Sequence, residues 1–112
     1  MNVLAFRVSF FFAARIREAA RRAGATLALV EHGSLADEAE RAEADLVLLE
    51  IERADLAEIG RLKARPALAG ARVVGFGAHV QEELFAQARQ AGCDAVYAKG
   101  ELARRLEELL RA

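Results

Sequence analysis

Residues 44–51 read Ala-Asp-Leu-Val-Leu-Leu-Glu-Ile, and this stretch decides the fold. An apolar run of this length is too short for an ordinary helix, and it is typical of a strand buried on both faces of a parallel sheet. The run ends on the carboxylate of Glu50. Because ligands and chemistry collect outside the carboxyl ends of the strands in such sheets, Glu50 is the first candidate functional residue.

The rest of the chain alternates short apolar runs with amphipathic segments. Ser9 and Ser34 stand at two expected helix starts as capping residues, and Gly24 stands where the first helix should end. Five strands alternating with five helices predict a single α/β domain over residues 1–112, with a doubly wound, flavodoxin-like parallel sheet in the order 2-1-3-4-5. The expected strands are residues 3–8, 26–30, 44–51, 72–77 and 94–99, and the expected helices are about 10–23, 35–42, from about 55, 80–91 and 101–111.

Composition narrows the classes of function. The formal net charge of −1 gives no support for nucleic-acid binding. No apolar run approaches membrane-spanning length and the first residues do not resemble a secretory signal, so we expect a cytoplasmic protein that does not enter a membrane. The single cysteine, Cys93, fits a reducing compartment and is interpreted as a small buried hydrophobic residue.

Two segments resemble response-regulator receiver domains, the CheY-like family. Residues 44–51 resemble the family's Pro-Asp-Leu-Val-Leu-Leu-Asp-Ile, which sets Glu50 at the phosphoacceptor aspartate. Residues 91–100, Ala-Gly-Cys-Asp-Ala-Val-Tyr-Ala-Lys-Gly, resemble Ala-Gly-Ala-Asp-Asp-Tyr-Leu-Thr-Lys-Pro. This match sets Lys99 at the active-site lysine and Gly100 where a proline usually stands. The resemblance extends over the whole chain and implies the receiver fold and a role in two-component signal transduction.

The chain departs from the family at several site positions. The family ends strand 1 in an acidic pair that holds Mg²⁺, whereas this chain has Arg7 and Val8, so we expect Mg²⁺ binding to be lost and no cofactor to be required. The hydroxyl residue that follows the phosphoryl group at the end of strand 4 is replaced by Gly77. The aromatic switch position on strand 5 falls on Val96, and Tyr97 should therefore point to the opposite face of the sheet.

The remaining charges suggest a substitute for the metal and the phosphoryl group. If the receiver alignment holds, Arg7, Glu50 and Lys99 converge at the strand ends, and a guanidinium can serve as counter-charge to a carboxylate. We therefore hypothesise a fixed cluster of these three side chains that holds the loops in one state without phosphate.

Two kinds of surface are candidates for a protein partner. A helix cannot bury Phe10, Phe11 and Phe12 together against one sheet face, so Phe10 or Phe11 should be partly exposed beside the crevice. Tyr97 belongs with them as a possible partner residue. The resemblance further implies a homodimer through helix 4, strand 5 and helix 5.

Other chemistry has weaker support. The Gly75-Phe76-Gly77 segment precedes a helix and could approach a phosphate, although it lacks the further residues of a P-loop. His32 and His79 have no partner at metal-ligand spacing and are interpreted as loop residues. No nucleophile, base and orienting residue can be assembled into a catalytic site.

These observations predict a stand-alone, degenerate receiver that acts as a signalling or adaptor module by binding a protein, without standard phosphorylation and without enzymatic activity. The first alternative is a phosphorelay receiver with an atypical acceptor site. The second alternative is a flavodoxin-like enzyme or ligand-binding protein that uses the Gly75–Gly77 loop and Lys99.

Overall fold

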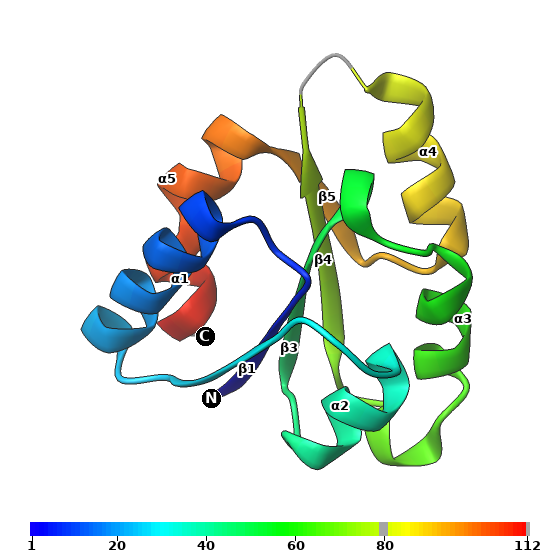
Figure 1. Ribbon diagram of the computed structural model, residues 1–112, viewed down its shortest axis with the longest axis horizontal. Coiled ribbons are helices and arrows are strands. Elements are labelled where there is room, and N and C mark those ends of the chain that lie inside the picture. Colours follow the sequence, from blue (N-terminus) through cyan, green and yellow to red (C-terminus); the bar gives the residue numbers. More distant parts are fainter. Residues whose placement is uncertain (79–80, 112) are drawn as a thin grey trace.

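The computed structural model describes residues 1–78 and 81–111. It contains a five-stranded parallel sheet in the order β2-β1-β3-β4-β5, as the sequence predicts (Figure 1). The strands are β1 (Asn2–Phe6), β2 (Thr26–Val30), β3 (Leu46–Glu50), β4 (Arg72–Gly77) and β5 (Ala95–Ala98). The helices are α1 (Phe10–Ala23), α2 (Leu35–Arg41), α3 (Ala57–Lys63), α4 (Glu82–Ala91) and α5 (Lys99–Arg111), with short 3-10 turns η1 (Ile51–Arg53) and η2 (Pro66–Leu68).

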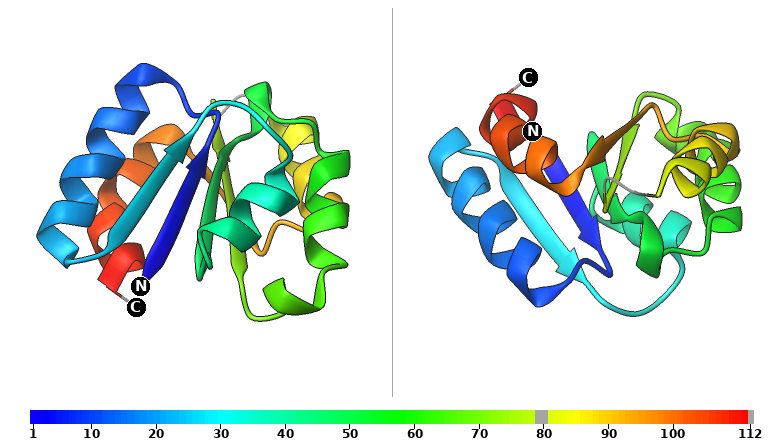
Figure 2. Two further views of the ribbon diagram at one scale, coloured as in Figure 1. Left: turned by 60° about the horizontal axis from the view of Figure 1, so that its bottom comes forward. Right: turned by 90° about the horizontal axis from the view of Figure 1, so that it is seen from above.

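The helices cover both faces of the sheet. Helices α1 and α5 lie side by side on one face, and α2, α3 and α4 lie on the other (Figures 1 and 2). Among the described helices, none combines the length and the apolarity needed to cross a bilayer.

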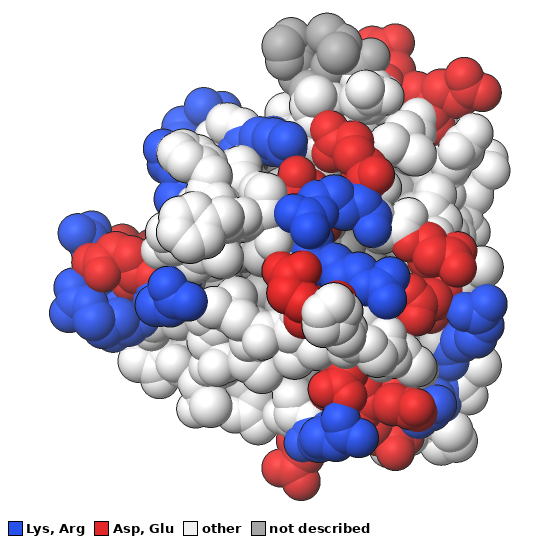
Figure 3. Space-filling view, viewed as in Figure 1, with Lys and Arg blue, Asp and Glu red and all other residues white. Residues whose placement is uncertain are grey.

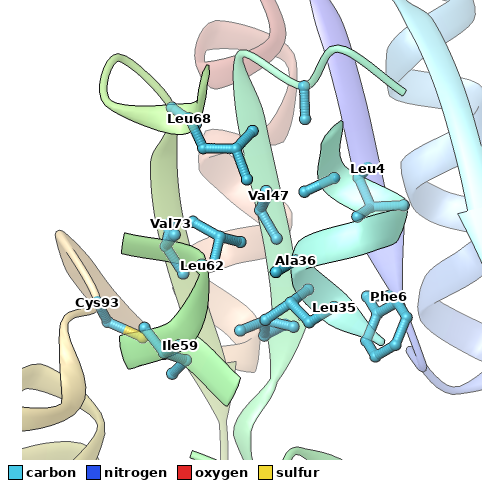
Figure 4. Packing of buried hydrophobic residues seen from close by; sticks show 14 of the residues in the cluster. Leu4, Phe6, Leu35, Ala36, Val47, Ile59, Leu62, Leu68, Val73 and Cys93 are labelled. Atoms are coloured by element: carbon cyan, nitrogen blue, oxygen red, sulfur yellow. The ribbon is translucent and has the colours of Figure 1, made fainter. Parts of the chain in front are cut away.

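Strand β3 lies at the centre, and all five of its residues are buried. Successive side chains alternate between the faces, so Leu46 and Leu48 join the core beneath α1 and α5 while Val47 and Leu49 join the core beneath α2, α3 and α4. Figure 4 shows the second of these cores, where Val47 packs among side chains from several elements. The prediction of a strand buried on both faces is therefore confirmed.

Two aspartates, Asp45 immediately before β3 and Asp94 immediately before β5, have structural roles that the sequence analysis did not predict. The Asp45 carboxylate accepts the backbone N–H of Asn2 at 2.7 Å, and the Asp94 carboxylate accepts that of Val73 at the same distance. Each aspartate also donates its own N–H to the carbonyl of the same residue. Asp94 further pairs with Lys63 at 2.6 Å. Both side chains therefore fix the register of neighbouring strands at the amino ends of the strands, opposite the end where Glu50 lies.

Several boundaries differ from the prediction. Strand β1 ends at Phe6 because Arg7 adopts a φ of +54°, outside the range of a strand. Helix α3 begins at Ala57, two residues later than expected, and the Asp55 carboxylate accepts the N–H of Ala57 at 3.0 Å. Helix α5 begins at Lys99, two residues earlier than expected. Helix α4 begins at Glu82, and the expected start at residue 80 lies outside the described residues.

Candidate functional site

The candidate site lies at the carboxyl ends of β1, β3, β4 and β5, with Glu50 at its centre. Glu50 is the last residue of β3 and only 5% of its surface is exposed. Its Oε1 accepts the backbone N–H of Ser9 at 2.8 Å, and its Oε2 lies 3.3 Å from Nζ of Lys99. Ser9 precedes α1 and Lys99 opens α5, so one carboxylate joins the starts of two helices that are distant in sequence.

The surroundings of Glu50 keep its carboxylate ionised. Burial alone would raise the pKa of Glu50, because a charge is poorly solvated inside the protein. The hydrogen bonds from Ser9 and the ammonium of Lys99 outweigh that effect and hold the pKa below its ordinary value. The site therefore contains a stable negative charge.

A second carboxylate, that of Glu52, completes the cluster. Its Oε2 accepts the backbone N–H of Ala78 at 3.0 Å and lies 3.9 Å from Nζ of Lys99. Lys99 consequently stands between two carboxylates. Ion pairs join it to Glu50 and Glu52 at the end of β3, and a hydrogen bond joins Glu52 to the residue after β4. Sequence reasoning missed Glu52, although its position two residues after Glu50 at a strand end was a usable signal. We call Glu50, Glu52, Lys99 and the Ala78 amide the carboxylate cluster.

Arg7 does not belong to this cluster, and the predicted pairing of Arg7 with Glu50 is wrong. Its guanidinium donates to the backbone carbonyl oxygens of Glu31 at 3.2 Å and Gly33 at 3.4 Å. It also lies 3.9 Å from the carboxylate of Glu58. The physical reason is the positive φ of Arg7, which turns the chain out of the strand and directs the side chain toward the loop after β2.

The end of β4 is packed too closely to hold a side chain. A Cβ added to Gly77 would lie 2.9 Å from both Cγ1 of Ile51 and Oε1 of Glu52, and one added to Gly75 would lie 2.7 Å from Cγ2 of Ile51. Both glycines lie within β4 and are buried, so they do not form an open loop before a helix. Because these glycines have no side chains, the buried Ile51 can pack directly against β4.

Comparisons with known proteins identify the architecture. No family model and no curated protein matches the sequence. Solved structures do match. A signal receiver domain of a DNA-binding response regulator from Colwellia psychrerythraea shares 15% identity with a TM-score of 0.75, and the alignment covers 98% of each chain. The fold is that of a response-regulator receiver domain.

Two further solved structures share this fold. A response regulator from Thermotoga maritima has a TM-score of 0.75 at 17% identity, covering 100% of this chain and 99% of the other. The third is an atypical orphan response regulator, whose structure is described as revealing a new phosphorylation-independent regulatory mechanism. It has a TM-score of 0.72 at 22% identity, covering 99% of this chain and 96% of that one.

The residues present do not fit the Mg²⁺ that receiver domains hold at this edge of the sheet. The side chain of Val8 is buried at 2% exposure and has no oxygen atom, and the guanidinium of Arg7 is a cation. Glu50 already pairs with the ammonium of Lys99, and within the described residues no group of three or more His, Cys, Asp or Glu side chains could hold a metal. These side chains therefore do not provide the several oxygen ligands that a hard dication needs.

The aromatic residues divide between surface and core. Phe10 and Phe11 are 91% and 61% exposed, as expected for consecutive aromatics at a helix start, whereas Phe12 is buried and lies 4.7 Å from the Phe76 ring between centroids. Tyr97 is half-buried beneath α1 and α5, and the Arg105 guanidinium lies 5.2 Å from its ring centroid.

The remaining candidates have simple structural roles. Val96 is buried in the opposite core from Tyr97, which confirms that these two neighbours point to opposite faces. Ser34 caps α2 by accepting the N–H of Asp37, whereas Ser9 occupies the capping position of α1 without a side-chain hydrogen bond to the helix. Cys93 is buried, and that burial raises the pKa of its thiol to about 11.

The sequence interpretation of His32 and His79 as loop residues is tested only for His32. His32 is an exposed residue in the loop after β2, and His79 lies outside the described residues.

Proposed function

We propose that this chain is a receiver-like signalling module that acts by binding a protein and does not depend on phosphorylation of the β3 carboxylate. The observation that carries the proposal is the carboxylate cluster. Glu50 and Glu52 supply two negative charges at the strand ends, and Lys99 neutralises them in part.

The cluster offers a physical substitute for a phosphoryl group. In the receiver family, a hydroxyl at the end of strand 4 follows that group. Here the residue is Gly77, and the next amide, Ala78 N–H, is instead held by Glu52. The Glu52 carboxylate therefore accepts the hydrogen bond from the amide that follows β4. The loops stay in one arrangement without a phosphodonor.

Other observations agree with this proposal. Both carboxylate oxygens of Glu50 are already bound, and Val8 has no side-chain carboxylate to bind Mg²⁺. An incoming phosphoryl group would therefore lack the usual neutralisation of its charge. The phosphorylation-independent orphan regulator supplies a precedent on the same fold. The alternative that uses Gly75 and Gly77 as a phosphate loop gains no support, because Ile51 fills the space beside them. The homodimer through α4, β5 and α5 stays a prediction.

The test is an amide NMR spectrum titrated with Mg²⁺ and then with beryllofluoride, a mimic of an acyl phosphate. We expect the resonances of Glu50, Ala78 and Lys99 to stay in place. Saturable shifts centred on these residues would refute the proposal and favour a receiver with an atypical acceptor.

A Glu52→Gln variant checks the cluster itself. Removing the charge of Glu52 should shift the Ala78 amide resonance upfield, because the hydrogen bond to a carboxylate becomes one to a neutral amide. Glu107→Gln, near the last turn of α5 and partnered with Arg111, is the matched control and should leave Ala78 unchanged.

A further inference from the structure

Two large aromatic side chains stand exposed at the start of α1. Phe10 and Phe11 have 91% and 61% of their surfaces in contact with solvent, and they are the only exposed phenylalanines in the described part of the chain. Figure 3 shows uncharged side chains projecting over the start of α1, with Lys and Arg atoms on both sides of them. Neighbouring exposed aromatics of this kind are typical of a surface that contacts a partner.

A groove of about 350 Å³ lies next to Phe11, between the first turns of α1 and α5. Phe11 and Phe12 form part of its apolar surface, with their rings edge to face at 5.7 Å between centroids. The lining residues are Ser9, Phe11, Phe12, Arg15, Lys99, Gly100 and Ala103.

The charged side chains that line the groove are both cations. Arg15 and Lys99 line it, and none of its described lining residues is acidic. The Arg15 guanidinium lies 4.8 Å from the centroid of the Phe11 ring, so the cation and the aromatic surface are presented together. The first turn of α1 also contains no acidic side chain.

We infer that this groove binds an acidic, apolar segment of a protein partner. An apolar side chain of the segment packs on Phe11 and Phe12, and a carboxylate of the segment lies beside Arg15. The inference rests on the proposed function and specifies the chemistry of the partner. Charge complementarity favours this occupant over a second copy, because a two-fold contact through the same face would bring Arg15 of one copy toward Arg15 of the other.

Lys99 gives the groove a connection to the carboxylate cluster. Its ammonium lies 3.3 Å from Glu50 and 3.9 Å from Glu52, and its side chain is 38% exposed. A segment that occupies the groove contacts the exposed part of this side chain, so occupation of the groove should be registered at the ends of β3 and β4.

Selection from a phage-displayed library of random peptides tests the chemistry of the ligand. Peptides are selected on the intact protein, and those that also bind Phe11→Ser are removed. The Phe11 side chain is largely exposed, so this variant should fold normally, which circular dichroism verifies. We expect enrichment of peptides that combine Asp or Glu with Leu, Phe or Trp. Enrichment of basic or uncharged peptides, or no enrichment, would overturn the inference.

Calorimetry with the synthesised consensus peptide then measures each contact. Phe11→Ser and Arg15→Glu should each weaken binding at least about tenfold, as expected for central interface residues. Arg89→Glu, an exposed position on α4, is the matched control and should change affinity less than about twofold. Equal loss in the control, or no loss in the groove variants, would contradict the assignment.

Sedimentation distinguishes the other occupant. A wild-type dimer that becomes a monomer in Phe11→Ser would show that a second copy fills the groove, and would overturn the inference. Failure of the proposed function is separate, since it appears as beryllofluoride-dependent shifts at Glu50 and Ala78 whatever the peptides do.

Discussion

Replacing Lys99 with Met removes the ammonium from the carboxylate cluster while keeping an unbranched apolar stem of similar length. At 3.3 Å from Glu50, Coulomb's law with an effective dielectric constant of about 20 gives about 5 kcal/mol. The Lys99 side chain is 38% exposed, so solvent screening and the cost of desolvating the charges remove most of that value. We expect Lys99→Met to lower the free energy of unfolding at pH 7 by about 1–2 kcal/mol.

The loss should depend on pH in a defined direction. Because the pKa of Glu50 is lowered in the folded protein, its ionised form contributes stability that is present above its unfolded pKa of about 4.3 and is lost as pH falls through the folded value. Without Lys99, the folded pKa of Glu50 rises. The difference between wild type and Lys99→Met should therefore be full at pH 7 and shrink below about pH 4.3.

Urea unfolding at several pH values, with a double-mutant cycle, measures both effects. The cycle combines Lys99→Met with Glu50→Gln, whose amide oxygen can still accept the N–H of Ser9. Arg61→Met, at an exposed position on α3, controls for the loss of a surface cation. A coupling energy below about 0.3 kcal/mol, or a deficit that does not change with pH, would refute the electrostatic account of the cluster.

Three other perturbations test the packing around the site. Gly77→Ala should destabilise the protein by about 1–3 kcal/mol in urea unfolding, because its Cβ meets Ile51 at 2.9 Å, whereas Gly70→Ala, which meets nothing within 4 Å, should cost less than about 0.5 kcal/mol. Arg7→Ala should lower the free energy of unfolding by about 1–2 kcal/mol, because the hydrogen bonds to the two backbone carbonyls are lost. Its effect should add to that of Glu50→Gln within about 0.5 kcal/mol. A larger coupling energy would show that Arg7 and Glu50 do interact, as the sequence analysis hypothesised. Cys93, with its thiol pKa raised to about 11, should react with iodoacetamide at pH 8 about a hundredfold more slowly than in the urea-unfolded chain, and equal rates would contradict its burial.

Local patterns were sufficient to predict the architecture. The uninterrupted apolar run of β3 predicted burial on both faces. Gly24 predicted the end of α1, where it adopts a left-handed φ of +72°. These signals are reliable because each depends on neighbouring residues and on the period of the element they form. The exposure of Phe10 and Phe11 followed from the same geometry, since one helix cannot turn three consecutive side chains inward.

The membership of the carboxylate cluster was decided only by the tertiary structure. The resemblance to receiver domains predicted that Lys99 lies near Glu50 at the strand ends, and the two side chains are 3.3 Å apart in the structure. The sequence could not show that Arg7 turns away at a positive φ, or that Glu52 reaches the amide of Ala78. Partner choice at a strand end depends on ångström-scale backbone direction in segments far apart in the chain, and hydrophobic periodicity contains no information about that direction.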